Sequence, residues 1–332
     1  MRPIVTEPLT SHPLDDRLAA VRELVIADSL TVMDDPFAST LFDAWLPLWR
    51  AATWPSIAML PQVVCEAAGG DPQRVTAASA AWQHLYLAAK YFDDIQDEGC
   101  RPCRPEVSIG LGLLFKAQNL LTTYYPELRA ADVTLELPRI LWEASRGQYA
   151  DWEMSAATTS VATAERWLAQ AHAKSGTLLG WSAGFGSVLA NVSPEQAAAY
   201  QYFGERLGIL IQVADDFKDM WSVNGAKPLN VAMSSLPLCF ARTVISEREW
   251  AQLQLILESV AQGNEEALVE LRQQLTDWGA PAYVAVIAKI HRQQACDALA
   301  EADCPQPDLL KRLLDQIFPL SEIEGLSGEA FL

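Results

Sequence analysis

Apolar residues recur at three- and four-residue spacing along most of the chain, which is the period of an amphipathic α-helix. No stretch of useful length alternates apolar and polar residues, so the pattern predicts no β-strand. The helices that it predicts are residues 17–30, 75–97, 163–191, 194–221, 247–262 and 264–278. Residues 163–191 are apolar on more than one face, which is typical of a helix at the centre of a bundle.

Capping and turn residues agree with several of these boundaries. Ser246 stands three residues before Glu249, and Ser193 is followed by Pro194. Both patterns are favoured at helix N-termini, because they satisfy or avoid the amides that lack a partner in the first turn. Residues 69–72, Gly-Gly-Asp-Pro, predict the end of one helix and the start of the next.

We predict a single all-α domain over residues 1–332, with residues 1–13 and 321–332 as loosely attached ends. The chain has no internal repeat, Gly/Ser linker or low-complexity run, and its 50% hydrophobic residues can form a sizeable core. No run reaches the roughly 18 uncharged apolar residues of a membrane span. Residues 1–15 lack the pattern of a signal peptide, so we expect a cytoplasmic protein.

The formal net charge is −18. Such a charge argues against nucleic acid or an anionic membrane as a partner, because phosphate groups would be repelled, whereas bound metal cations would offset part of it. Cys100 and Cys103, two of the six cysteines, have the spacing of a zinc or redox pair. No second pair has such spacing, so we expect reduced thiols, and the role of these two stays open.

A first cluster of aspartates, Asp93, Asp94 and Asp97, ends the predicted helix 75–97. Asp93 and Asp97 are four residues apart and share a helix face, so their ionised carboxylates repel each other. A hard divalent cation such as Mg²⁺ removes this repulsion, because it takes carboxylate, water and phosphate oxygens as ligands.

A second cluster repeats this arrangement at Asp215, Asp216 and Asp219, after another apolar helical run. Gln212 lies one turn before Asp216 and has an amide that can bind a phosphate oxygen or metal-bound water. A solvent-exposed acidic helix end is the alternative interpretation of either cluster alone. Two copies in the same context favour metal binding.

At these residues the chain resembles the trans-isoprenyl diphosphate synthase family and its class I terpene synthase relatives. The resemblance runs from about residue 46 to about residue 242. It rests on a series of motifs in the family's order: DDxxD at Asp93, Asp94 and Asp97, GQxxD at Gly147, Gln148 and Asp151, the Lys-Thr pair at Lys174 and Ser175, QxxDDxxD at Gln212 to Asp219, the lysine at Lys227, and Leu-Pro at Leu236 and Pro237.

The resemblance implies an isoprenoid synthase-type helical bundle with a central active-site cavity, as a homodimer. It implies Mg²⁺ as cofactor, three ions with substrate bound, on Asp93, Asp97, Asp215 and Asp219, with Asp94 and Asp216 as further catalytic residues. The residues expected to bind the diphosphate are Lys174, Gln212, Lys227, Arg101 and Arg104. The residues expected to line the pocket are Ala88, Ala89, Tyr86, Phe92 and Trp181.

The chain departs from chain-elongating members of the family where these bind isopentenyl diphosphate, the second substrate. Ala51, Ala52 and Trp54 stand at positions of a Lys and two Arg, and Tyr86 stands at the position of a His. A diphosphate is costly to bury without compensating charge, so these losses predict that isopentenyl diphosphate does not bind. Arg50 could shift to fill this role, but one arginine replaces several cationic groups poorly.

The favoured hypothesis is therefore a class I terpene synthase-like lyase or hydrolase acting on one allylic diphosphate. The small residues Ala88 and Ala89 predict a deep pocket, for a C15 or C20 substrate or a pre-cyclised diterpenyl diphosphate. The cation would end by cyclisation, deprotonation or water capture. The alternatives are a prenyltransferase, chain-elongating or peptide-prenylating, with an atypical isopentenyl diphosphate site, and a non-catalytic subunit. Intact acidic clusters argue against the last.

Overall fold

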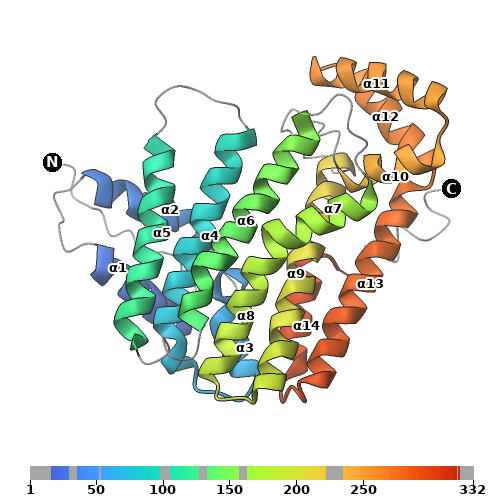
Figure 1. The fold of residues 1–332 in the computed structure, drawn as a ribbon. Coiled ribbons are helices and arrows are strands. Elements are labelled where there is room, and N and C mark those ends of the chain that lie inside the picture. Colours follow the sequence, from blue (N-terminus) through green and yellow to red (C-terminus); the bar gives the residue numbers. More distant parts are fainter. Residues whose placement is uncertain are drawn as a thin grey trace. The chain divides into compact units, whose positions relative to one another are not determined.

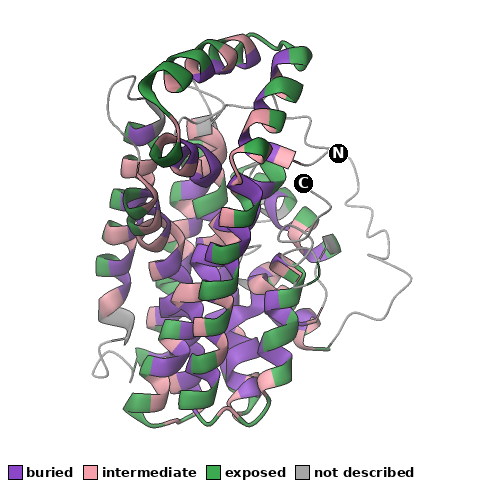
Figure 2. Ribbon diagram, turned by 90° about the vertical axis from the view of Figure 1, so that its right-hand side faces the viewer, coloured by how far each residue is buried: buried purple, intermediate pink, exposed green. Residues whose placement is uncertain are grey.

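The computed structural model describes residues 16–29, 36–51, 54–97, 105–126, 133–156, 163–221, 235–319 and 321. Every regular element in these ranges is a helix (Figure 1), which confirms the predicted all-α fold. Most helices carry exposed residues along one side and buried residues along the other (Figure 2), as their amphipathic sequences require. No helix of this described part is long and apolar enough to cross a membrane.

The contacts of the chain define two compact units. The first consists of residues Met1–Leu135, Phe185–Ala197 and Cys304–Leu310, and the second consists of Glu136–Gly184, Ala198–Asp303 and Lys311–Leu332. The single domain over residues 1–332 stays a prediction.

The first unit is built around helix α4, which ends in the first acidic cluster. Its helices are α1 (Asp16–Ser29), α2 (Pro36–Ala51), α3 (Leu60–Ala67), α4 (Thr76–Asp97) and α5 (Pro105–Tyr124), with the short 3-10 helices η1 (Ile57–Met59) and η2 (Pro72–Val75). Helix α4 packs along α5 (Figure 1) and also contacts α1 and α3.

The break between α3 and α4 lies where the glycines predict it. Gly69 has a φ of 81°, in the left-handed region that favours glycine, and Asp71 accepts a hydrogen bond from the amide of Gln73 at 2.9 Å to start η2. The Tyr125 hydroxyl accepts from the Ala78 amide at 3.1 Å, so α5 also anchors the first turn of α4.

The second unit contains the second acidic cluster and most of the C-terminal half of the chain. Its helices are most of α6 (Val133–Ala156), α7 (Ala164–Ala171), the π-helix η4 (His172–Gly176), much of α8 (Thr177–Leu189) and of α9 (Pro194–Trp221), α10 (Leu236–Val244), α11 (Glu247–Ala261), α12 (Glu265–Asp277), α13 (Ala280–Glu301) and the part of α14 (Pro307–Ile317) that begins at Lys311.

The predicted helix 163–191 differs from the structure in one respect. It contains five residues of π-helix between α7 and α8, because the apolar pattern does not reveal one extra residue in a turn. Residues 178–187 of α8 are all buried, which confirms the expectation of a central helix.

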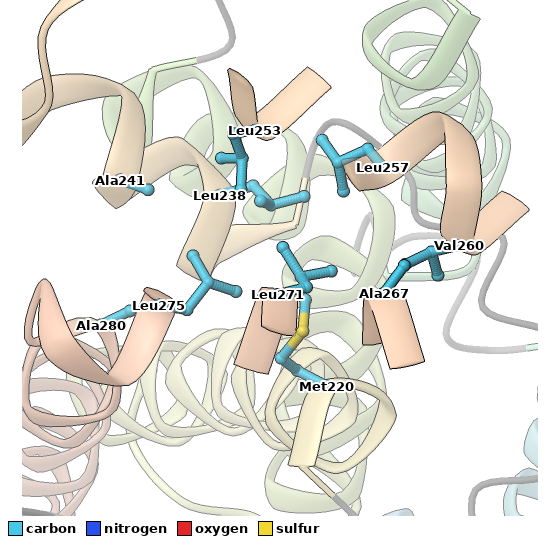
Figure 3. Close-up of a cluster of buried hydrophobic side chains, with 10 residues drawn as sticks. All are labelled: Met220, Leu238, Ala241, Leu253, Leu257, Val260, Ala267, Leu271, Leu275 and Ala280. Atoms are coloured by element: carbon cyan, nitrogen blue, oxygen red, sulfur yellow. The ribbon is translucent and has the colours of Figure 1, made fainter. Parts of the chain in front are cut away.

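A cluster of buried apolar side chains fixes the C-terminal end of α9 (Figure 3). Met220 of α9 packs there with Leu238 of α10, Leu253 of α11 and Leu271 of α12, all of them fully buried or nearly so. Helix α11 begins with the predicted cap, since the Ser246 hydroxyl accepts from the Glu249 amide in a capping box. Met220 directly follows Asp219 in the chain, so the packing of this cluster holds the end of the second acidic motif.

Candidate active site

The first acidic cluster occupies the last turns of α4. Asp93 and Asp94 are half-buried, and Asp97 is the final residue of the helix. The Asp94 carboxylate lies 3.8 Å from the Lys90 ammonium, and the exposed fraction is 42% for the Asp94 side chain and 61% for the Lys90 side chain. An exposed ion pair of this kind contributes at most about 1 kcal/mol to stability, so little free energy is lost if Asp94 leaves Lys90 to bind a cation.

Further carboxylates from α2 and α5 gather near the same end of α4. Burial raises the pKa of the Tyr91 hydroxyl, and the negative charges of Glu106, Asp94 and Asp43 raise it further. These three acids come from three different helices, so the first cluster lies in a wider field of negative charge. Such a field favours the binding of cations.

The predicted pocket residues of α4 have different surroundings. Ala88 is fully buried, whereas the adjacent Ala89 is exposed. The Tyr86 ring is half-buried and lies 6.1 Å from the Trp82 ring, and the Phe92 ring packs against α5 at Gly110. Of the two alanines, only Ala89 has an exposed side chain.

The second acidic cluster lies on the last two turns of α9. Asp215 and Asp219 are exposed, while Asp216 is half-buried and accepts a hydrogen bond from the Leu236 amide at 2.7 Å. Burial raises the pKa of Asp216 to about 8, against the opposing effect of the Leu236 amide. The negative charges of Asp151, Asp215 and Asp219 add to the rise. Four carboxylates are therefore close enough to interact.

Lys174 contributes a positive charge to this acidic group. Its ammonium lies 2.8 Å from the Asp151 carboxylate, with exposed fractions of only 14% and 28% for the two side chains. Gly147, one turn before Asp151 on α6, makes the approach possible, because a Cβ there would collide with the Lys174 backbone nitrogen. The structure thus brings together Gly147, Asp151 and Lys174, which belong to two different motifs of the resemblance.

The π-helix η4 sets the direction of Lys174 and was not predicted. On its other side, Gly208 of α9 approaches Gly176 so closely that a Cβ would lie 2.7 Å from the Gly176 backbone. The Glu205 carboxylate lies 3.4 Å from His172 Nε2, at the start of the π-turn. Glycines four residues apart at 176, 180 and 184, and at 204 and 208, are the sequence signal that could have indicated this close helix crossing.

Two cationic side chains that sequence analysis also missed hold the end of α9. The Arg272 guanidinium of α12 donates to the Met220 carbonyl at 2.6 Å, and Lys218 donates to the Ile317 carbonyl at 3.3 Å. Both are favourable at this place, because the last carbonyls of a helix carry partial negative charge and lack partners within the helix.

Several predicted residues lie outside the described residues: Arg101, Arg104, Lys227, Cys100 and Cys103. Gln212 is half-buried, one turn before Asp216, and Trp181 is buried in α8. The cysteines of the described ranges, Cys65, Cys239, Cys296 and Cys304, are not joined by disulfide bonds.

The residues present fit Mg²⁺, with one restriction. Both clusters offer carboxylate oxygens, the ligands that Mg²⁺ prefers, and the mutual repulsion around Asp216 is the kind that a cation relieves. In the described part of the chain, no three His, Cys, Asp or Glu side chains converge closely enough to hold a metal by themselves. A cation would therefore need further oxygens, such as those of phosphate or water.

Comparisons with known proteins identify the family. Residues 104–274 match the family model of the polyprenyl synthetases. The chain belongs to the polyprenyl synthetase family. It is 25% identical over 262 residues to the short chain isoprenyl diphosphate synthase of Methanothermobacter thermautotrophicus, with 74% of this chain and 78% of the relative covered. It is 27% identical over 179 residues to the geranylgeranyl diphosphate synthase of Mycobacterium tuberculosis, covering 51% of each.

Solved structures of this family share the fold. The geranylgeranyl pyrophosphate synthase from Corynebacterium glutamicum, complexed with calcium and isoprenyl diphosphate, matches with a TM-score of 0.74 at 19% identity. The match covers 95% of this chain and 96% of that one. This likeness confirms the isoprenoid synthase-type helical fold.

These comparisons show that the prediction of a terpene synthase-like lyase or hydrolase is wrong, because the related proteins are named as diphosphate synthases. They favour the chain-elongating alternative. The prediction relied on cations missing at Ala51, Ala52 and Trp54. A guanidinium can reach such a place from elsewhere in the chain, and Arg17 of α1 lies 4.6 Å from the Trp54 ring centroid.

Proposed function

We propose that the protein is a Mg²⁺-dependent prenyltransferase that extends an allylic isoprenyl diphosphate with isopentenyl diphosphate. The family and the names of the relatives support this activity. The observation that carries the proposal is the Lys174–Asp151 pair, held at 2.8 Å beside the second acidic cluster. A buried cation among carboxylates matches a ligand that combines phosphate with divalent metal.

The reaction requires expulsion of diphosphate with the electron pair of its carbon–oxygen bond. The double bond of isopentenyl diphosphate then supplies the electrons of the new carbon–carbon bond, and a proton is lost. Mg²⁺, when bound by Asp93, Asp97, Asp215 and Asp219, supplies Lewis acidity and a template for the leaving group. Lys174 contributes a point charge to the same oxygens, with Gln212, Lys227, Arg101 and Arg104 as the further proposed contacts.

For the allylic chain we propose a C15 or C20 substrate, in a pocket bordered by α4. Ala89 is small and exposed, so it leaves room for a growing chain at this position. Tyr86, Phe92 and Trp181 are proposed neighbours whose rings stabilise positive charge by cation–π attraction.

The second diphosphate needs cations that the aligned positions do not supply. Arg50, in the last turn of α2, is exposed, and Arg17 lies over Trp54 while its guanidinium pairs with Glu66 at 2.7 Å. We propose that Arg50 binds isopentenyl diphosphate, with Arg17 holding Trp54 in place. Arg50→Gln should raise the KM for isopentenyl diphosphate and leave the KM for the allylic substrate unchanged, while Arg248→Gln, on exposed α11, serves as the control.

The test of the function is incubation of the purified protein with Mg²⁺ and C10, C15 or C20 allylic diphosphates, each with and without isopentenyl diphosphate. We expect a longer diphosphate only when isopentenyl diphosphate is present. A hydrocarbon or alcohol formed from the allylic diphosphate alone would contradict the proposal. Inactivity with every pair would do so as well.

We further propose that the protein is a homodimer that uses the exposed aromatic stripe of α6. Trp142, Tyr149 and Trp152 are 65%, 60% and 49% exposed and share one helix face. The substitutions Trp142→Lys and Trp152→Lys together should give a monomer in light scattering after gel filtration. Val286→Lys, at an exposed position of α13, should leave the mass unchanged.

A further inference from the structure

Helix α10 begins without the capping that a helix of its kind normally has. Its N-cap residue is Ser235, yet the Ser235 hydroxyl makes no capping hydrogen bond and has no partner among the described residues. The second helical residue is Pro237, which has no amide hydrogen. The amide of Leu236 is thus the first donor of the helix that needs an acceptor.

The acceptor comes from the second acidic motif. The Leu236 amide donates to Asp216 Oδ2 at 2.7 Å, a contact between residues twenty positions apart in the chain. The accepting oxygen lies at the N-terminus of α10, where the amides of the first turn lack partners within the helix. The middle aspartate of the motif therefore does for α10 what a side-chain cap normally does, while Asp215 and Asp219 remain exposed.

We propose that Asp216 is a positioning residue, the external cap of α10, and that it is not a metal ligand. The role of Asp216 as a cap does not depend on the proposed function. Only the expected effects on turnover rest on the proposed prenyltransferase activity. The Asp216–Leu236 bond joins the last turns of α9 to the first residue of α10.

The contacts of α10 link this cap to Lys174. Helix α10 packs against α7, and α7 continues directly into the π-turn that carries Lys174. On its other side, Leu238 and Ala241 belong to the buried cluster around Met220 (Figure 3). Loss of the cap should therefore disturb the binding of the allylic diphosphate through Lys174 and leave the carboxylates of Asp215 and Asp219 in place.

The two roles of Asp216 predict different effects of substitution. Asparagine retains an oxygen that accepts from the Leu236 amide, whereas alanine does not. A neutral amide is a poor replacement for a carboxylate ligand of Mg²⁺. If Asp216 is a cap, Asp216→Asn should keep its function and Asp216→Ala should lose it. If Asp216 is a metal ligand, both substitutions should impair its function. Asp215→Asn provides the matched comparison at a proposed ligand.

The first experiment measures hydrogen exchange of residues 236–244 in the metal-free protein, without substrate. We expect at least tenfold faster exchange at the start of α10 in Asp216→Ala and unchanged exchange in Asp216→Asn and Asp215→Asn. Unchanged exchange in the alanine variant would overturn the cap. This measurement is independent of the proposed function, since it involves neither Mg²⁺ nor turnover.

The second experiment measures prenyl transfer against Mg²⁺ concentration. Asp216→Asn should keep the half-saturating Mg²⁺ concentration within threefold of the unaltered protein, and Asp216→Ala should raise the KM for the allylic diphosphate about tenfold. Asp215→Asn should raise the half-saturating Mg²⁺ concentration. If Asp216→Asn raises it as much as Asp215→Asn does, Asp216 is a ligand and the proposal is wrong.

Discussion

The two acidic clusters have the same spacing, and their surroundings differ. On α4, Asp94 has an exposed partner one turn earlier on its own helix, Lys90 at 3.8 Å. On α9, Asp216 is bound by the first amide of another helix, and the last turn is held by Arg272 and Lys218. The ion pair of Asp94 is thus local to its helix, whereas the hydrogen bond of Asp216 joins residues twenty positions apart in the chain.

This difference separates what a motif determines from what the fold determines. A spacing of four residues places two carboxylates on one helix face in either cluster. Whether a third carboxylate is free to bind a cation depends on neighbours that the motif does not contain. We therefore expect the two clusters to contribute equally to metal binding and unequally to the stability of the fold.

The largest effect is expected from the proposed ligands themselves. Asp93→Asn and Asp215→Asn should each lower kcat by more than about 100-fold, since even the outer-shell partners of a metal cost 10–100-fold. Circular dichroism should show unchanged helix content in both variants. Near-normal turnover of either variant in a steady-state assay would show that its cluster does not bind the catalytic metal.

Part of this site could be predicted from the sequence, and part could not. The helix 194–221 was predicted to the residue, because Pro194 fixes its start and its apolar period continues to Trp221. The π-turn at Lys174 was missed, since periodicity averages over several turns. The bond from Leu236 to Asp216 depends on how the chain returns after α9, and no local pattern contains that information.

The next largest effect concerns Lys174. Lys174→Gln should raise the KM for the allylic diphosphate and lower kcat, together about 10- to 100-fold in kcat/KM, because a charge-assisted contact of about 1.5–3 kcal/mol is lost. Lys174→Arg keeps the charge but not the compact shape, so it should restore only part of the activity. Equal kinetics for Lys174→Gln and the unaltered protein would exclude diphosphate binding by Lys174.

The stability of the second cluster should depend on pH through Asp216. The folded-state pKa of Asp216 is raised from 3.8 to about 8, so the folded protein holds this proton more tightly than the unfolded chain does. The resulting stabilisation is complete below the lower value and is lost as the pH rises toward the higher one.

The measurement is the Tm in EDTA between pH 5 and pH 9. We expect the Tm to fall with rising pH by several degrees, since 1 kcal/mol corresponds to about 2–4 °C in a chain of this size. Asp216→Asn should remove most of this fall, and Asp277→Asn, at an exposed position of α12, should not. If the Tm of Asp216→Asn falls as much as that of the unaltered protein, the pH dependence comes from other groups.

A smaller effect separates the two alanines of α4. Ala89→Phe should shorten the main product by at least one isoprene unit with little change in Tm, because the side chain is exposed and can meet the substrate chain. Ala88→Phe should instead lower the stability by about 1–3 kcal/mol, since the site is fully packed. Product lengths from chromatography and Tm values distinguish the two, and the reverse pattern would mean that Ala88 borders the pocket.

The smallest effect is expected at the rear of the π-turn. The Glu205 carboxylate lies 3.4 Å from His172 Nε2 and 3.5 Å from the Arg206 guanidinium. A partly exposed pair contributes about 0.2–1 kcal/mol, so Glu205→Gln should raise the KM for the allylic diphosphate at most about fivefold, with kcat unchanged. Glu258→Gln, on the exposed face of α11, is the control. A larger loss that also affects kcat would show that the π-turn determines the reaction geometry as well as the position of Lys174.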